Sequence, residues 1–175
     1  MSYVAAAVAP LAQPLCQVRK YLWISDQETA IATSVDTYRD QGIGAILNVD
    51  DTDHSSAGKK AWKDAQLSYR FYKTLEVPTT DIVKRARQIH AHIVHNKALG
   101  IGTLVHCHAG KNRRAACILL HLFWEEGGSY DIRLADLRVV RPRAAPMYAF
   151  QRQLRREMDV ARADDEEAKA AGVEH

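Results

Sequence analysis

The sequence predicts an α/β fold with a mostly parallel central sheet of about four to five strands, flanked by helices on both faces. Short apolar runs alternate with stretches of helical periodicity along the chain, which is the order typical of this class. Residues 44–49 and 102–107 lack the alternation of a half-exposed strand, which indicates strands buried on both faces. No repeat or low-complexity linker interrupts the 175 residues, so we expect one domain.

The N-terminal half is expected to contain three strands. Residues 20–25 (KYLWIS) form the first, and residues 26–42 then have the spacing of a helix that ends at a glycine. Residues 44–49 (GAILNV) form the second strand. A polar loop with a brief helix around Trp62 leads to the third strand, the alternating, aromatic residues 67–74 (LSYRFYKT).

The C-terminal half is expected to contain a long helix, a central strand and three further helices. Apolar residues recur at steps of three and four through residues 79–100, where a threonine can cap the start and a glycine can end the helix. Residues 102–107 (GTLVHC) are the strand, and the following helices are expected at 113–128, 130–141 and 146–162.

Three parts of the chain are distinguished by composition: an N-terminal extension (1–19), a folded domain (20–160) and an acidic C-terminal tail (161–175). The extension is apolar, but two prolines interrupt it and no basic segment precedes its alanines. We therefore expect neither a signal peptide nor a membrane span, and no integral membrane association.

The composition, 47% hydrophobic and 26% charged, is that of a globular protein. The net charge of +3 is mild and does not indicate nucleic-acid binding. Because the tail is acidic, the region before it is clearly basic, which favours an anionic substrate or partner. The three cysteines have no regular spacing, which indicates reduced thiols and a cytoplasmic or nuclear protein.

The segment LVHCHAGKNRRAACILL (104–120) carries the chemistry, because Cys107 lies where a buried strand gives way to a helix. Ligands of α/β sheets bind at such carboxyl-end turns, and the N-terminus of a helix attracts anions. The positive electrostatic potential at the N-terminus of a helix also stabilises a cysteine thiolate relative to the thiol. Gly110 lets the backbone approach an anion closely, and Arg113 offers a planar fork that matches two phosphate oxygens.

The sequence HCHAGKNR resembles the His-Cys-x5-Arg signature of the protein tyrosine phosphatase superfamily, with Cys107 and Arg113 at its defining positions. The segments YLWISDQETA, GIGAILNVDD and VVRPRAAPMYAFQRQL are similar, in order, to those of dual-specificity-type phosphatases. The resemblance covers residues 20–157. It implies the fold of that family and a phosphatase domain at 20–160.

The resemblance also implies a mechanism without metal or cofactor. Cys107 would attack phosphorus and form a thiophosphoryl intermediate, while Arg113 would hold the equatorial oxygens. His106 would lie behind the thiolate, orient the loop and favour the anion. The phosphate would rest in the loop formed by His108, Ala109, Gly110, Lys111 and Asn112.

The leaving oxygen needs a proton, so a carboxylic acid is expected on a neighbouring loop. The position that corresponds to the family's acid is Glu76 in KTLEVPTTDI. Asp81 is the rival, although its place at the start of a helix favours a capping role. Asp50 and Asp51, which close a strand, are further candidates.

Two features bear on turnover and substrate. The family usually has Ser or Thr after the signature arginine, where its hydroxyl supports the departing thiolate, and this chain has Arg114. The second step could therefore be slow, or the chain could be a weakly active module that binds phosphate. His108 and Lys111 make the loop basic, as in phosphoinositide phosphatases. Phosphoproteins are the expected substrates, with phosphoinositides, inositol phosphates and RNA 5′-triphosphates as alternatives.

Other features have simpler interpretations. HAHIVH contains three histidines, but of these only His92 and His95 could share a helix face, so no zinc site is expected. Rhodanese-like sulfur transfer also uses a cysteine loop, but Arg113 at this spacing argues against it. Cys117 is expected in the core, and Arg141 and Arg143 could flank the site or end a helix. The oligomeric state is not determined by the sequence.

Overall fold

The computed structural model describes residues 15–108 and 111–170. A five-stranded sheet has the order β1-β2-β5-β3-β4, in which only the β1–β2 pair is antiparallel. The strands are β1 (Cys16–Arg19), β2 (Leu22–Asp26), β3 (Ile43–Asp50), β4 (Ser68–Lys73) and β5 (Gly102–Cys107). This arrangement confirms the predicted fold class.

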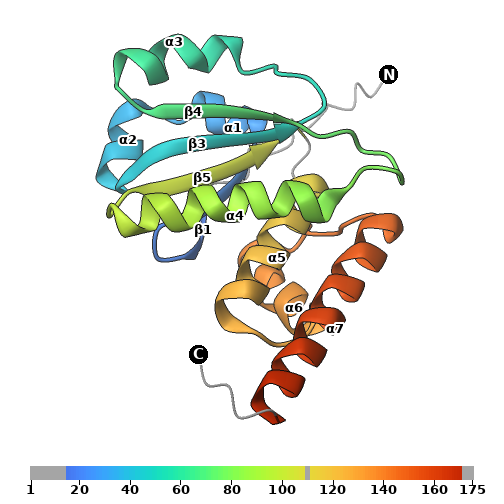
Figure 1. The fold of residues 1–175 in the computed structure, drawn as a ribbon. Helices are drawn as coiled ribbons and strands as arrows, with labels where there is room; N and C mark the ends of the chain where they lie inside the picture. The colour runs from blue at the N-terminus through green and yellow to red at the C-terminus, as the bar shows by residue number, and fades with distance from the viewer. Residues whose placement is uncertain (1–14, 109–110, 171–175) are drawn as a thin grey trace, which may run out of the picture.

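Helices cover both faces of the sheet (Figure 1). Three short helices pack on one face: α1 (Gln27–Ala32), α2 (Val35–Asp40) and α3 (Ser56–Asp64). Four longer helices form a layer on the other: α4 (Ile82–Ala98), α5 (Arg113–Glu126), α6 (Tyr130–Val140) and α7 (Tyr148–Ala170). In the described part of the chain, every helix is too short or too polar to cross a lipid bilayer.

The elements differ from the sequence predictions at three places, apart from shifts of one to three residues at helix ends. The helix predicted over 26–42 is two helices, because the backbone is extended at Thr33 and the hydroxyl of Ser34 accepts the N–H of Thr37 to cap a new one. Strand β1 was not predicted, since it is four residues long in a segment without strand periodicity. Helix α7 continues to Ala170, beyond the predicted end at 162.

Strand β5 and helix α5 form the centre of the fold and position the signature segment. All six residues of β5 are buried, because the strand lies between β2 and β3. Residues 113–123 of α5 are also buried, because the helix packs between the sheet and α4, α6 and α7. The chain therefore passes from a central strand to a central helix at the carboxyl edge of the sheet, which is where Cys107 lies.

We expect acid to destabilise the fold through His121, whose imidazole is buried in α5 and lies 2.9 Å from that of His90 in α4, measured between their Nδ1 atoms. Burial lowers the pKa of His121 to about 4. The unfolded chain binds this proton more tightly, with a pKa of about 6.5, so stability is present at neutral pH and falls as the pH decreases from 6.5 toward 4.

Replacing the histidine by His121→Gln should remove about 1–2 kcal/mol of the difference in unfolding free energy between pH 7.5 and pH 5. Urea denaturation at the two pH values measures this difference. His95→Gln is the matched control, because His95 is exposed on α4. Equal pH dependence in the His121→Gln variant and the wild-type protein would contradict the assignment.

Candidate active site

Cys107 and Arg113 lie at the two ends of the turn between β5 and α5. Cys107 is the last residue of β5 and Arg113 the first residue of α5. Both are buried, with exposed fractions of 2% and 5%. Of the residues between them, Ala109 and Gly110 lie outside the described residues, so their predicted place in a phosphate loop stays a prediction.

The guanidinium of Arg113 contacts three carboxylates. Its Nη1 lies 2.8 Å from Oδ1 of Asp50 and 3.6 Å from Oδ1 of Asp51, at the end of β3. Its Nε lies 3.2 Å from Oε2 of Glu76, in the loop after β4. Nη1 also donates to the carbonyl of Thr74 at 3.3 Å. The fork is thus oriented by the ends of β3 and β4.

Asp50 links Arg113 to the beginning of the loop. Its side chain is fully buried and accepts the backbone N–H of Asp51 at 2.8 Å and that of His108. Burial raises the pKa of Asp50, and the positive charge of Arg113 opposes this rise. A buried carboxylate with these partners is an anchor rather than a donor of protons to substrate. The sequence indicated it only as a minor candidate for the acid.

The structure separates the two main candidates for the general acid. The Glu76 side chain is 45% exposed and reaches Arg113. Asp81 is the N-cap of α4, where its carboxylate accepts the N–H of Lys84 at 2.8 Å. The capping interpretation of Asp81 is therefore confirmed. Glu76 has a carboxylate beside the arginine and accessible to solvent.

The second half of the loop is fixed by the connection between α6 and α7. The carbonyl of Lys111 accepts the N–H of Ala145 at 2.9 Å. The side-chain oxygen of Asn112 accepts the N–H of Met147 at 2.8 Å, so its amide is committed to the protein. The side chains of His108 and Lys111 are exposed and remain available to a ligand.

The surroundings of His106 do not fit one of the roles that the resemblance implied for it, which was to favour the thiolate anion. Its ring is fully buried, lies 6.3 Å from that of Trp62, and neither nitrogen has a hydrogen-bond partner among the described residues. Burial lowers the pKa of His106 to about 3, so the imidazole is neutral near physiological pH. It therefore contributes no positive charge to favour a thiolate, although it can still orient the strand.

Two further arginines are buried near the site. Arg114 is fully buried, and burial lowers its pKa to about 10. Arg141 is the C-cap residue of α6, and its Nη2 lies 3.0 Å from Oδ2 of Asp26 at the end of β2. Arg141 is therefore at a helix end and not exposed on the rim, and Arg143 is exposed. Cys117 is fully buried in the core, as expected, and burial raises its pKa to about 12.

The three histidines of α4 point to different partners. His90 contacts His121, Nδ1 of His92 lies 2.6 Å from the hydroxyl oxygen of Tyr72, and His95 is exposed. Within 15–108 and 111–170, no group of three or more acidic, histidine or cysteine side chains is placed to hold a metal ion.

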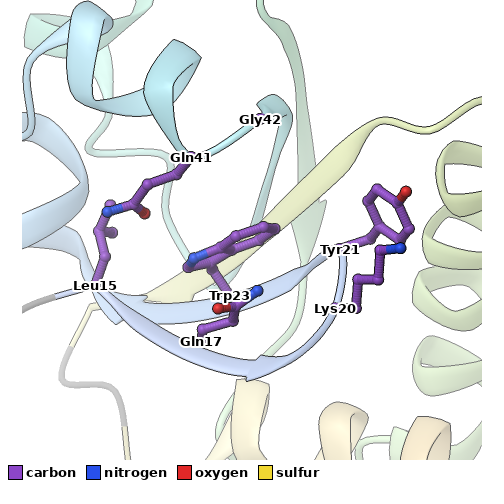
Figure 2. Close-up of a pocket in the computed structure, with 7 residues that line it drawn as sticks. All are labelled: Leu15, Gln17, Lys20, Tyr21, Trp23, Gln41 and Gly42. Carbon is purple, nitrogen blue, oxygen red and sulfur yellow. The ribbon is translucent and has the colours of Figure 1, made fainter.

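A cavity of about 440 Å³ lies at the opposite end of the sheet from Cys107. Figure 2 shows its lining residues, which come from Leu15 just before β1, from β1, the β1–β2 turn, the beginning of β2 and the turn after α2. Trp23 and Lys20 are among them. Because the strands β2 and β5 are parallel, this cavity is at their amino ends and separate from the signature loop.

The comparisons with known proteins agree with this geometry. No family model matches the sequence. Dual specificity protein phosphatase 12 of Homo sapiens is 30% identical over 126 residues, which are 72% of this chain and 36% of that protein. Dual specificity protein phosphatase 19 of Mus musculus is 26% identical over 138 residues, or 79% of this chain and 59% of that protein. The chain thus spans little more than a third of the first relative's length.

Solved structures share the fold over nearly their whole length. The human tyrosine phosphatase-like serine/threonine/tyrosine-interacting protein superposes with a TM-score of 0.76 at 19% identity, covering 85% of this chain and 98% of that one. A mouse putative dual specificity phosphatase complexed with zinc tungstate gives 0.75 at 21% identity, with 94% and 97% covered. The fold is that of dual-specificity phosphatases. By sequence and fold together, the chain belongs to the dual-specificity-like members of the protein tyrosine phosphatase superfamily.

Proposed function

We propose that the chain is a cysteine-dependent phosphatase that hydrolyses phosphate monoesters of proteins. The observation that carries this proposal is the placement of Cys107 and Arg113 at the two ends of the turn from β5 to α5, both buried. A sulfur nucleophile and a planar cation at the N-terminus of a helix suit the attack on a phosphoryl group.

In the first step the thiolate of Cys107 attacks phosphorus, so that a P–S bond forms as the P–O bond to the leaving group breaks. Arg113 holds two equatorial oxygens and neutralises charge in the transition state. The Glu76 carboxyl is the proposed source of the proton for the leaving oxygen, because it is half-exposed and 3.2 Å from the guanidinium.

In the second step water attacks the thiophosphoryl group. The P–S bond breaks, its electron pair returns to sulfur, and the carboxylate of Glu76 accepts the proton of the water. Inorganic phosphate leaves. To bind at Arg113, the phosphate dianion of the substrate must displace carboxylates that contact the guanidinium. The side chains of Glu76 and Asp51 can move away because each is about half exposed.

Phosphorylated tyrosine, serine or threonine of proteins is the proposed substrate. The support is the similarity to proteins named dual specificity protein phosphatases. We further place this activity in the cytoplasm or nucleus, because a reactive thiolate is lost by oxidation outside a reducing compartment.

Hydrolysis of an aryl phosphate should continue in the presence of EDTA and should fall by at least about 10³-fold in Cys107→Ser. Arg113→Lys should also cause a large loss, because lysine keeps the charge but cannot form the fork. Cys117→Ala is the matched control and should retain activity, since Cys117 lies in the core.

Steady-state rates with purified protein measure these effects. Full activity of Cys107→Ser would contradict the mechanism. The wild-type protein is also offered phosphopeptides, phosphoinositides and inositol phosphates. A higher kcat/KM for a phosphoinositide than for every phosphopeptide would contradict the proposed substrate class alone.

The role of Glu76 predicts a dependence on the leaving group. Glu76→Gln should slow phosphotyrosine hydrolysis by about 10²-fold, because the phenolate needs a proton, and should slow an aryl phosphate with an acidic leaving phenol far less. Asp81→Asn is the control, because asparagine also caps a helix. Comparison of kcat/KM for the two substrates measures the effect, and equal losses for both would assign the proton to another group.

A further inference from the structure

A pocket of about 570 Å³ opens beside the signature loop, on the side of helix α1. Its lining comes from the end of β2, from α1 and from the first residue after Cys107, and consists of Asp26, Gln27, Glu28, Ile31, Ala32 and His108. It is distinct from the cavity in Figure 2, which lies at the amino ends of the parallel strands. The proposed reaction assigns no role to this pocket.

The pocket adjoins the place where the phosphate is expected. Asp26 is paired with Cys107 in the register of β2 and β5, and His108 follows Cys107 in the chain. The backbone N–H of Gln27 donates to the carbonyl of His108 at 3.5 Å, so the beginning of α1 is joined to the beginning of the loop. A substrate whose phosphate is attacked by Cys107 therefore has neighbouring atoms close to this pocket.

One side of α1 forms a wall of the pocket. Residues 27, 28, 31 and 32 are neighbours on this side, because helical residues three or four apart lie next to one another. Ile31 is partly buried against the apolar core, and Ala32 is exposed. The wall is thus apolar at Ile31 and Ala32 and carries the carboxylate of Glu28 about one turn earlier.

The two carboxylates that line the pocket differ in their partners. Asp26 is occupied, since its Oδ1 accepts the N–H of Thr29 at 2.9 Å and its Oδ2 lies 3.0 Å from Nη2 of Arg141. Glu28 is exposed and forms no ion pair or side-chain hydrogen bond within 15–108 and 111–170. Glu28 therefore gives the pocket a negative charge that a ligand can compensate.

We propose that this pocket binds a lysine or arginine side chain of the phosphoprotein substrate, close in sequence to the phosphorylated residue. The inference rests on the proposed function, because it names the sequence preference of the same site. The methylene groups of the basic side chain lie against Ile31 and Ala32, and its cation reaches the carboxylate of Glu28 while it stays hydrated. The region before the C-terminal tail is otherwise basic, so the preference is confined to the position that reaches Glu28.

Phosphotyrosine peptides that differ at a single position test this inference. Each peptide has lysine or methionine at one of the two positions before or the two positions after the phosphotyrosine, with alanine elsewhere. Methionine resembles the lysine stem in length but has no charge. The wild-type protein should favour lysine at one of these positions, with a ratio of kcat/KM of about three to five. Ratios of one or less at every position would overturn the inference.

Substitution of Glu28 tests whether its charge causes the preference. Glu28→Gln should bring the ratio close to one at the preferred position, and Glu28→Lys should reverse it in favour of methionine. Asp40→Lys is the matched control, because it makes the same change in charge at an exposed residue of α2 outside the pocket, and it should keep the wild-type ratio.

Each ratio compares two peptides on one variant, so a general loss of activity cancels. A wild-type ratio in Glu28→Lys, or an equal change in Asp40→Lys, would overturn the inference. Circular dichroism checks folding, and if Glu28→Lys does not fold, the ratio in Glu28→Gln decides.

The same experiment separates this inference from the proposed function. Hydrolysis of the lysine and methionine peptides at equal rates overturns the inference alone. Absence of hydrolysis of every peptide by the wild-type protein overturns the proposed function instead. Calorimetric titration of the wild-type protein with the same peptides then compares their dissociation constants. Tighter binding of one lysine peptide, lost in Glu28→Lys, would support the pocket as a binding site, and equal constants would overturn it.

Discussion

The guanidinium of Arg113 lies 2.8 Å from the carboxylate of Asp50, and both groups are buried at the carboxyl edge of the sheet. This ion pair joins the end of β3 to the beginning of α5, and Asp50 also accepts the backbone N–H of His108. Removal of one partner from such a pair leaves an uncompensated buried charge, which costs about 3–5 kcal/mol. The position of the arginine is therefore coupled to the folding of the sheet.

Two consecutive arginines face different surroundings because successive residues of a helix differ in direction by about 100°. Arg113 extends toward the ends of β3 and β4, where Asp50, Asp51 and Glu76 lie. Arg114 is fully buried, and the charged groups that act electrostatically on it include Asp26 at the end of β2 and Arg141 at the end of α6.

Local patterns in the sequence were sufficient to predict β5 and α5, because a continuous apolar strand followed by a helix leaves few alternatives. For the cap of α4 the sequence offered a threonine, which is wrong, and Asp81, which the structure confirms. The break between α1 and α2 depends on one serine cap, which a weakly periodic stretch does not make evident. The charge of His106 was not predictable, because its neutrality results from burial by Trp62 and the rest of the fold.

Long-range ion pairs were the features that sequence patterns could not provide. Asp26 and Arg141 are separated by more than half of the chain. Asp50 ends strand β3, whereas Arg113 begins helix α5. Their pairing follows from the strand order β2-β5-β3, which places the ends of β2 and β3 on either side of Cys107. A signal was nevertheless present, because each acidic residue closes a buried strand and so must lie at the same edge as the signature loop.

The most direct test is to mix the protein with an aryl phosphate, quench the reaction in acid within milliseconds and locate any bound phosphoryl group by mass spectrometry. The expected result is one phosphoryl group on the peptide that contains Cys107. Hydrolysis that proceeds while the phosphoryl group is found on another residue, or on none, would contradict the view that Cys107 and Arg113 form the centre of this site.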